Sequence, residues 1–290
     1  MALCDEVRAH CAQIAGSARS VKIDVGALAT ITAEPFATLD ARTHYLDGSP
    51  EDVARYLLTL DAINFGSGWF PTLRKRPACS GYLTVASRLS DRFRAEGPWS
   101  NAELRSVDTA TVALILGQSP DHELMALYAQ ALRSLGDWLG GRTVLAAIEE
   151  AGGSAEQLAT RLASAMALFN DRGFYKRAQI VPANLALAGV ASFNDLDRLT
   201  IFADNLVPHV LRCEGVLVYD ERLAAHIDAG RLLRLGPQER EIRACAVHAC
   251  ELLSRRLGVA PRVLDNWLWN RGQKAEYKAR PRHRCRCVYY

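Results

Sequence analysis

Hydrophobic residues recur every three or four positions along most of the chain, a spacing that places side chains on one face of an α-helix. Several of these segments also carry helix-boundary signals. Ser49 and Pro50 form an N-cap and first-turn pair, Ser154 stands three residues before Gln157 as in a capping box, and Gly258 is a stop signal. The segments with this pattern are residues 49–65, 121–141, 154–169, 236–258 and 260–272.

Strand signals are few and short. Apolar and polar residues alternate weakly in residues 20–25 and 285–290. No internal repeat and no linker rich in Gly, Ser or Pro divides the sequence. We therefore expect one mainly α-helical domain over residues 1–290, with a few short strands that pair near the chain termini.

The composition is that of a globular protein, with 49% hydrophobic and 23% charged residues. The formal net charge of +3 is slight for 290 residues and gives no electrostatic reason to expect a nucleic-acid polymer as partner. The N-terminus has scattered charges and no apolar leader segment. The longest uncharged run, residues 180–194, is too short to span a bilayer. We expect a cytoplasmic protein with no membrane partner.

Neither the cysteines nor the histidines have metal-site spacing. The eight cysteines include no C-x-x-C pair, and the one close pair is Cys285 and Cys287. Histidines such as His209, His226 and His248 are dispersed along the chain. We expect free thiols and no metal ion.

A polar pair stands at the end of the first predicted helix. Asp61 and Asn64 are three residues apart and therefore share a helix face, just before glycines break the helix. One interpretation is a capping arrangement around a glycine turn. The other is a polar pair at the mouth of a pocket, with Phe65, Trp69 and Phe70 as its walls.

Two adjacent cations, Lys176 and Arg177, precede the apolar run that begins at residue 180. An ammonium beside a guanidinium is suited to binding a phosphate group. The alternative is an exposed helix end without a ligand.

Asp204 interrupts a further apolar segment, residues 199–212, in which Leu199, Phe202, Leu206 and Val210 keep helical spacing. Because Pro208 disfavours helix in the residue before it, the pattern predicts Asp204 in a last helical turn, where the helix dipole opposes its charge. A carboxyl group in such a setting can donate a proton or bind a base edge. The alternative is an ion pair with a nearby arginine such as Arg212.

The segment "DNWLWN" at residues 265–270 combines a carboxylate with large aromatic side chains. On a helix, Asp265 and Trp269 share a face and Asn270 lies beside them. Tryptophan is a good stacking surface for a heterocyclic base. The alternative is a helix that only packs the core. The sequence contains no dinucleotide-binding, Walker, nucleophile-elbow or zinc-protease motif. Aspartates with aromatic residues and cations are compatible with hydrolysis at an anomeric carbon.

The sequence resembles the queuosine salvage family, the queuosine 5'-phosphate N-glycosylases/hydrolases, from about residue 20 to the C-terminus. The ordered set of segments carries this resemblance: "RSVKID", "LDAINF", "YKRAQI", "LTIFADNLVP", "EREIRA", "ACELL", "LDNWLWN" and "PRHRCRCVYY". The resemblance implies a helical fold akin to helix-hairpin-helix DNA glycosylases, with no metal or organic cofactor. It also implies hydrolysis of queuosine 5'-monophosphate at its N-glycosidic bond, which releases the 7-deazaguanine base queuine.

The resemblance also assigns roles to residues. Phe202 would stack on the base and Asp204 would face its polar edge. Asp265 and Trp269 would line the base and ribose, and His44 would make a further contact to the base or its side arm.

The 5'-phosphate requires cations. Lys176 and Arg177 are the first choice, and the basic tail around Arg282, His283 and Arg284 is the second.

Asn270 occupies a position where the family pattern has an aspartate beside the anomeric carbon. An amide keeps the size of a carboxylate but lacks the charge that would stabilise a developing cation, a loss of roughly 10³-fold in rate. The residue is either an aspartate-to-asparagine change that traps substrate or a natural variation in which Asp204 or Asp265 carries more of the catalysis. We favour the first explanation, which predicts tight substrate binding and poor turnover.

The partner expected from these observations is a small molecule, queuosine 5'-monophosphate, bound by a monomer. Two alternatives stay open. One is a base-flipping glycosylase that acts on intact nucleic acid, which the near-neutral charge disfavours. The other is a protein that binds queuosine nucleotides without cleaving them, which Asn270 would allow.

Overall fold

The computed structural model describes residues 1–32 and 38–290, and helices form most of it, which confirms the mainly α-helical prediction. The five helical segments predicted from hydrophobic periodicity over residues 49–65, 121–141, 154–169, 236–258 and 260–272 each contain a helix. Ser49 Oγ accepts a hydrogen bond from the Asp52 amide, and Ser154 Oγ accepts one from the Gln157 amide. The reciprocal half of the predicted capping box is not formed, because the Ser154 amide donates to the Ala151 carbonyl instead. The matching elements are α3 (Pro50–Ala62), α7 (Glu123–Leu139), α9 (Ala155–Ala165), α13 (Pro237–Leu257) and α14 (Pro261–Arg271).

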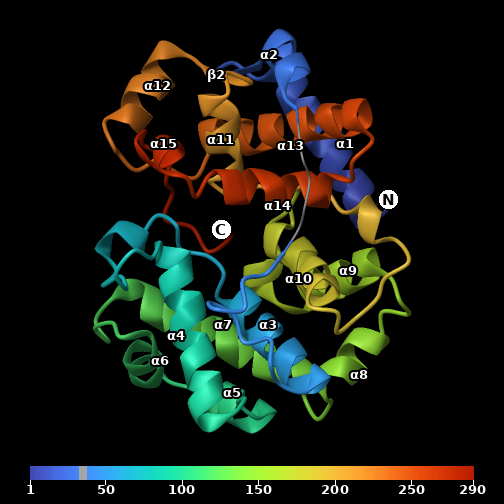
Figure 1. The fold of residues 1–290 in the computed structure, drawn as a ribbon, viewed down its shortest axis with the longest axis vertical. Coiled ribbons are helices and arrows are strands. Elements are labelled where there is room, and N and C mark those ends of the chain that lie inside the picture. Colours follow the sequence, from blue (N-terminus) through green and yellow to red (C-terminus); the bar gives the residue numbers. More distant parts are fainter. Residues whose placement is uncertain (33–37) are drawn as a thin grey trace.

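Figure 1 shows two groups of helices, with α10 (Lys176–Leu187) between them. The lower group contains α3, α7 and α9 together with α4 (Gly81–Glu96), α5 (Asn101–Ser106), α6 (Thr109–Leu116) and α8 (Val144–Glu149). The upper group contains α13 and α14 together with α1 (Leu3–Ser17), α2 (Val25–Thr30), α11 (Val207–Cys213), α12 (Glu221–Asp228) and α15 (Ala275–Lys278). The 3₁₀ helices are η1 (Phe70–Thr72), η2 (Ala167–Phe169) and η3 (Leu196–Arg198).

The predicted strand pairing near the termini is correct for one strand only. β1 (Val21–Ile23) pairs in antiparallel fashion with β2 (Leu217–Tyr219), with Lys22 opposite Val218. Residues 285–290 do not form a strand. They form an irregular segment whose side chains Cys285, Cys287 and Tyr290 are buried, so packing in the interior takes the place of sheet pairing.

This C-terminal tail lies against the turn that follows α3. The amides of Gly66 and Ser67 both donate to the Tyr290 carbonyl, at 2.9 and 3.3 Å. The backbone of Cys285 comes so close to Gly68 that a β-carbon there would lie 2.4 Å from its carbonyl oxygen. Gly68, one of the glycines that follow the first predicted helix, therefore also makes room for the tail.

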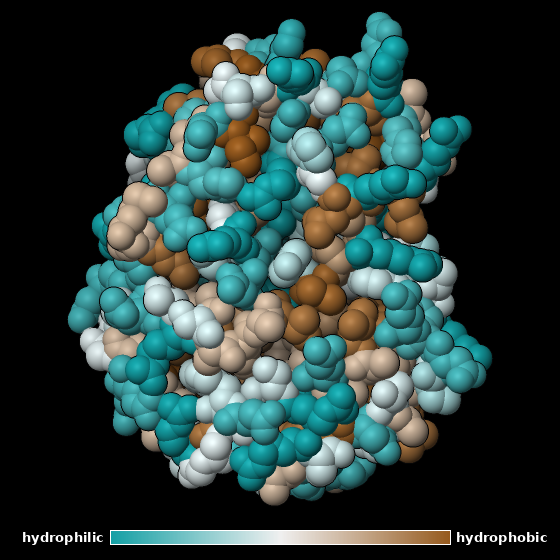
Figure 2. Space-filling view, turned by 180° about the vertical axis from the view of Figure 1, so that it is seen from behind, coloured by the Kyte–Doolittle hydropathy of each residue, from teal (hydrophilic) through white to brown (hydrophobic). Residues whose placement is uncertain are grey.

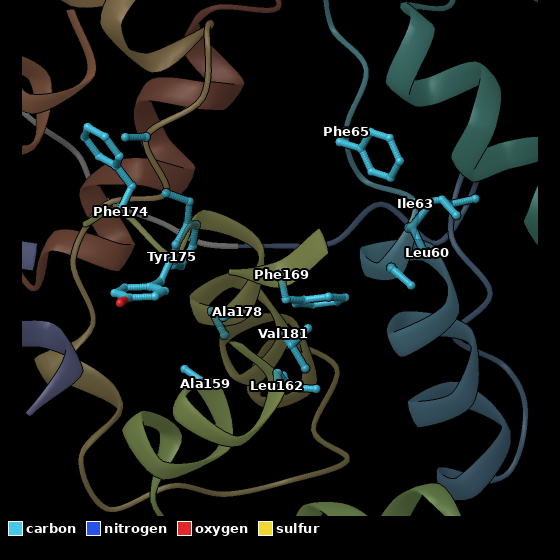
Figure 3. Close-up of a cluster of buried hydrophobic side chains, with 14 of the residues drawn as sticks. Leu60, Ile63, Phe65, Ala159, Leu162, Phe169, Phe174, Tyr175, Ala178 and Val181 are labelled. Carbon is cyan, nitrogen blue, oxygen red and sulfur yellow. The ribbon is translucent and has the colours of Figure 1, made fainter. Parts of the chain in front are cut away.

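The core between the two groups is largely apolar. Figure 3 shows side chains of α9, of α10 and its preceding turn, and of the end of α3 gathered in one buried cluster. Phe65 and Phe169 belong to it, and the guanidinium carbon of Arg177 lies 4.6 and 4.7 Å from their ring centroids. In contrast to this apolar core, hydrophilic side chains cover most of the surface in the view from behind (Figure 2). No helix in the described ranges has the length and apolar character needed to cross a membrane.

Candidate active site

A cavity of about 260 Å³ opens where α10, α14, the segment before α11 and the turn after α3 meet. Its walls combine aromatic rings with charged groups, the composition expected of a site for a flat polar ligand. The aromatic residues are Phe65, Phe70, Tyr82, Phe202, Trp269 and Tyr290. The charged residues are Asp40, Asp204, Asp265, Lys176, Arg262 and Arg282.

Asp265 is the most strongly perturbed carboxyl group of this cavity. It is buried, and its Oδ1 accepts a hydrogen bond of 2.8 Å from the Phe202 amide. Burial raises the pKa of Asp265 well above its usual value, and the nearby negative charge of Asp204 raises it further. The other carboxyl oxygen makes no hydrogen bond with the described residues and is therefore available to a ligand.

Asp204 lies in a different setting from the one predicted. Residues 199–206 are not helical, and Asp204 precedes α11. Its Oδ1 accepts hydrogen bonds from the amides of Leu206 and Val207, at 2.7 and 3.0 Å. The prediction of a last helical turn was wrong because Pro208 starts α11, where proline needs no amide hydrogen. These donors stabilise the negative charge that the predicted setting would have opposed.

The alternative for Asp204, an ion pair with Arg212, is also wrong. Arg212 pairs with Asp228 through two hydrogen bonds of 2.9 and 3.0 Å. Asp204 therefore keeps its unshared oxygen toward the cavity that it lines.

Lys176 lines the cavity and is not on an exposed helix end, which was the alternative to a phosphate-binding role. It is the first residue of α10 and is 4% exposed. Its ammonium donates to the Asn64 carbonyl at 3.1 Å. Burial lowers the pKa of Lys176, while the carboxylates of Asp204, Asp61 and Asp265 oppose this effect. The ammonium group thus lies in the electrostatic field of both cavity carboxylates.

Arg177, in contrast, is absent from the cavity wall. Its guanidinium donates to the carbonyls of Ala62, Leu168 and Val288 and is stacked between two phenylalanine rings. These contacts within the protein engage both terminal nitrogens and both faces of the guanidinium group. The structure therefore does not bring Arg177 together with Lys176 at the cavity, because consecutive residues on a helix point about 100° apart.

The second predicted source of cations, the basic tail, is better placed. Arg282 lines the cavity and forms no ion pair with any residue in the described ranges. The positive charges of Arg284 and Arg282 contribute to the lowered pKa of Lys75, after burial, so these three cations lie near one another. His283 points elsewhere and is 1% exposed in the interior.

His44 belongs to an aromatic wall of the cavity. Its Nε2 lies 3.0 Å from the Tyr82 hydroxyl, and its Nδ1 lies 3.0 Å from the Asp40 carbonyl. The ring of Tyr82 meets Trp269 edge to face, with centroids 5.5 Å apart. Burial lowers the pKa of His44, which favours the neutral imidazole. Phe202 also lines the cavity, so all the predicted aromatic contacts except Trp69 reach it.

Asp61 and Asn64 are neither a simple cap nor a pair that shares the cavity mouth. Asn64 lines the cavity, whereas Asp61 is fully buried behind its wall. Asp61 accepts hydrogen bonds from Asn64 and from Asn184. Asn184 is a cavity residue that the sequence interpretation missed. Its signal was an amide within the uncharged run 180–194, where a buried polar group needs a partner.

Asn270 lines the cavity, and its amide nitrogen is held within α14. It donates to the carbonyl and to the side-chain oxygen of Asn266, at 2.9 and 2.8 Å. An aspartate at this position has no amide hydrogen and could donate neither of these bonds.

The carboxyl groups of the cavity lie in two different environments. Across residues 1–32 and 38–290, no group of three or more His, Cys, Asp or Glu side chains is arranged to hold an ion. Asp204 and Asp265 instead differ in environment, one held by amide donors and one buried. Two carboxyl groups in such different settings can act as a charged stabiliser and a proton donor.

Comparisons with known proteins place the chain in a family. The family model described as "Queuosine salvage protein" matches residues 43–290. A protein of Sphaerobacter thermophilus named "Queuosine 5'-phosphate N-glycosylase/hydrolase" is 34% identical over 96% of this chain and 95% of its own length. Proteins with the same name from Mus musculus and Bos taurus are 31% and 35% identical, over 52% and 40% of this chain and the same shares of their own lengths.

Proposed function

Because this chain belongs to the queuosine salvage protein family, we propose that it hydrolyses the N-glycosidic bond of queuosine 5'-monophosphate and releases queuine. The observation that carries this proposal is the pairing of Asp204 and Asp265 in one aromatic-walled cavity. Hydrolysis at an anomeric carbon passes through an oxocarbenium-like transition state that a carboxylate stabilises and a proton donor assists. Asp204 and Asp265 both line the cavity, in different environments.

Asp204 is the charged partner in this mechanism. Two backbone amides hold its Oδ1, so the carboxylate is fixed before substrate binds and needs no reorganisation. Its charge stabilises the positive charge that develops on the ribose as the C–N bond breaks. It then accepts a proton from the water molecule that attacks the anomeric carbon.

Asp265 is the proton donor. Its raised pKa favours the protonated form that a proton donor needs, and its Oδ2 makes no hydrogen bond with the described residues. A 7-deazaguanine base has no N7 to protonate, so the donor must serve one of the remaining heteroatoms. The reaction leaves Asp265 deprotonated and Asp204 carrying the proton taken from water, and proton exchange with solvent restores both groups. The products are queuine and ribose 5-phosphate.

The aromatic residues bind the base, and the cations bind the phosphate. Phe202 and Trp269 offer ring surfaces for stacking. We assign the phosphate to Arg282, with Lys75 and Arg284 close to it, in place of Arg177. The ammonium of Lys176 interacts electrostatically with both Asp204 and Asp265, and we assign it to binding the ribose or the phosphate.

We also propose that Asn270 slows turnover. Its amide carries no charge to stabilise the oxocarbenium-like transition state and is directed to Asn266. Asn270→Asp is expected to raise the hydrolysis rate by roughly 10³-fold if residue 270 is the main anionic group. An equal rate in both forms would assign that role to Asp204.

The test is mass-spectrometric detection of free queuine after incubation of queuosine 5'-monophosphate with this chain and with Asn270→Asp. Release by either form supports the proposed hydrolysis. Binding without release by both forms would refute it in favour of a protein that binds the nucleotide. A steep fall in affinity with salt for tRNA, but not for the nucleotide, would favour action on intact nucleic acid.

A further inference from the structure

Behind the cavity wall, a buried carboxylate connects two amide side chains from different elements. Asp61, on α3, is fully buried and does not line the cavity. Asn184, on α10, donates from Nδ2 to both of its carboxyl oxygens, at 3.1 and 3.0 Å. Asn64, in the turn after α3, donates from Nδ2 to Oδ1 at 3.4 Å. Both asparagines line the cavity.

This arrangement determines which way the two amides face. An ionised carboxylate accepts hydrogen bonds and donates none, so each asparagine must present its NH₂ group to Asp61. A side-chain amide is planar, and its oxygen then lies on the other side of the group. Neither amide oxygen accepts a hydrogen bond from the described residues, and neither is a buried atom without a partner. Both oxygens are therefore open to the cavity.

We infer that Asp61 is a positioning residue that fixes Asn64 and Asn184 as a pair of hydrogen-bond acceptors, and that this pair selects a ligand with two neighbouring donors. The inference rests on the proposed function for the identity of the ligand. Two parts of a guanine-like nucleotide fit this chemistry: the vicinal hydroxyls of the ribose, and the ring N–H with its adjacent amino group. A ligand with acceptors at those positions would face two oxygens and be rejected.

The energetic setting of Asp61 favours this role over simple packing. Burial raises the pKa of Asp61 to about 6, although the bonds from Asn184 and the charge of Lys176 oppose the shift. No cation forms an ion pair with it in the described ranges, since Lys176 and Arg177 donate to carbonyl groups. An unpaired buried charge is unfavourable, and a packing role alone does not need one.

Asp61→Asn is the decisive variant because it keeps the size of the side chain and removes the acceptor-only character. The new amide replaces one acceptor oxygen with an NH₂ donor, which removes one of the two bonds from Asn184 and sets two donors against each other there. We expect the Kd for queuosine 5'-monophosphate, measured by calorimetry on a time scale shorter than turnover, to rise ~10-fold or more. The unfolding midpoint at neutral pH should not fall. Thr59→Val, a buried α3 change away from the cavity, is the matched control and should leave Kd unchanged.

A double-variant cycle tests whether Asp61 acts through Asn184. Asn184→Ala should raise Kd by a similar factor, and the combined variant should be no weaker than Asn184→Ala alone by more than ~3-fold. Effects that multiply would overturn the inference, as would an Asp61→Asn protein that binds normally and is merely less stable.

Substrate analogues identify which donors are recognised. One analogue lacks the 2'-hydroxyl and the other lacks the exocyclic amine. The analogue that lacks the donor recognised by Asn64 and Asn184 should bind the unmodified chain and Asp61→Asn with equal affinity. If both analogues still distinguish the two proteins by the full factor, the donor-selecting role is refuted. Queuine release is followed in parallel: binding without release refutes the proposed hydrolysis alone, whereas no binding by the unmodified chain overturns both proposals.

Discussion

Replacing Arg177 with lysine tests whether this guanidinium maintains the fold or binds a substrate phosphate. The side chain is 1% exposed and donates to the carbonyls of Ala62, Leu168 and Val288. It also stacks between Phe65 and Phe169. Lysine keeps the charge but supplies one compact ammonium group without a planar face.

The magnitude follows from the contacts that lysine cannot replace. Two of the three charge-assisted hydrogen bonds are lost, at about 1.5 kcal/mol or more each. Loss of stacking on two rings adds about 0.5 to 1 kcal/mol for each ring. The free energy of unfolding should fall by about 4 kcal/mol, a large share of the roughly 5–15 kcal/mol that stabilises a typical domain.

Urea unfolding followed by tryptophan fluorescence measures this change. With a slope of about 3 kcal/mol per molar urea, the midpoint of Arg177→Lys should fall by roughly 1 M. Arg222→Lys is the control, because Arg222 is exposed on α12 and its side chain makes no hydrogen bond with the described residues. The structural role would be refuted if the urea midpoint of Arg177→Lys stayed within about 0.2 M of that of the unmodified chain. If its KM also rose for the nucleotide but not for the nucleoside, the phosphate role would be restored.

Three further predictions concern the cavity. Arg282→Gln should raise KM for queuosine 5'-monophosphate ~10-fold and leave KM for the nucleoside unchanged, because only the nucleotide carries the phosphate; equal effects in steady-state assays would contradict this assignment. Trp269→Leu should weaken queuine binding, measured by calorimetry, by ~10-fold through lost stacking, whereas ribose 5-phosphate binding should not change. Asp61, whose pKa rises from 3.8 to about 6 on folding, contributes stability below pH 4 that is lost as pH rises to 6. The advantage of Asp61→Asn in unfolding free energy should therefore be about 2 kcal/mol larger at pH 7.5 than at pH 4, and a pH-independent difference would contradict the raised pKa.

Local signals in the sequence were sufficient for the long helices. The start of α3 at Ser49 and Pro50 and the end of α13 at Gly258 depend on residues within one turn of the boundary. These positions follow from capping and backbone conformation, which act over a few residues. The segment 199–206 was predicted wrongly because its apolar residues face partners on distant elements, as the bond from Phe202 to Asp265 illustrates.

The candidate site was predicted in part for the same reason. Asp265 and Trp269 share a helix, so their common face could be inferred from spacing. The different fates of Lys176 and Arg177 could not, because they depend on which neighbours surround α10. Asn184 meets Asp61 across two helices, and nothing within either segment encodes that contact.

The central claim is that Asp204 and Asp265 cleave the N-glycosidic bond in this cavity. The most direct test is a single-turnover measurement, with enzyme in excess over queuosine 5'-monophosphate, in which free queuine is quantified by mass spectrometry. The unmodified chain should release queuine, and Asp204→Asn and Asp265→Asn should each slow the release by ~10²-fold or more while retaining nucleotide binding. Release by both variants at the rate of the unmodified chain would show that neither carboxyl group takes part in the chemistry.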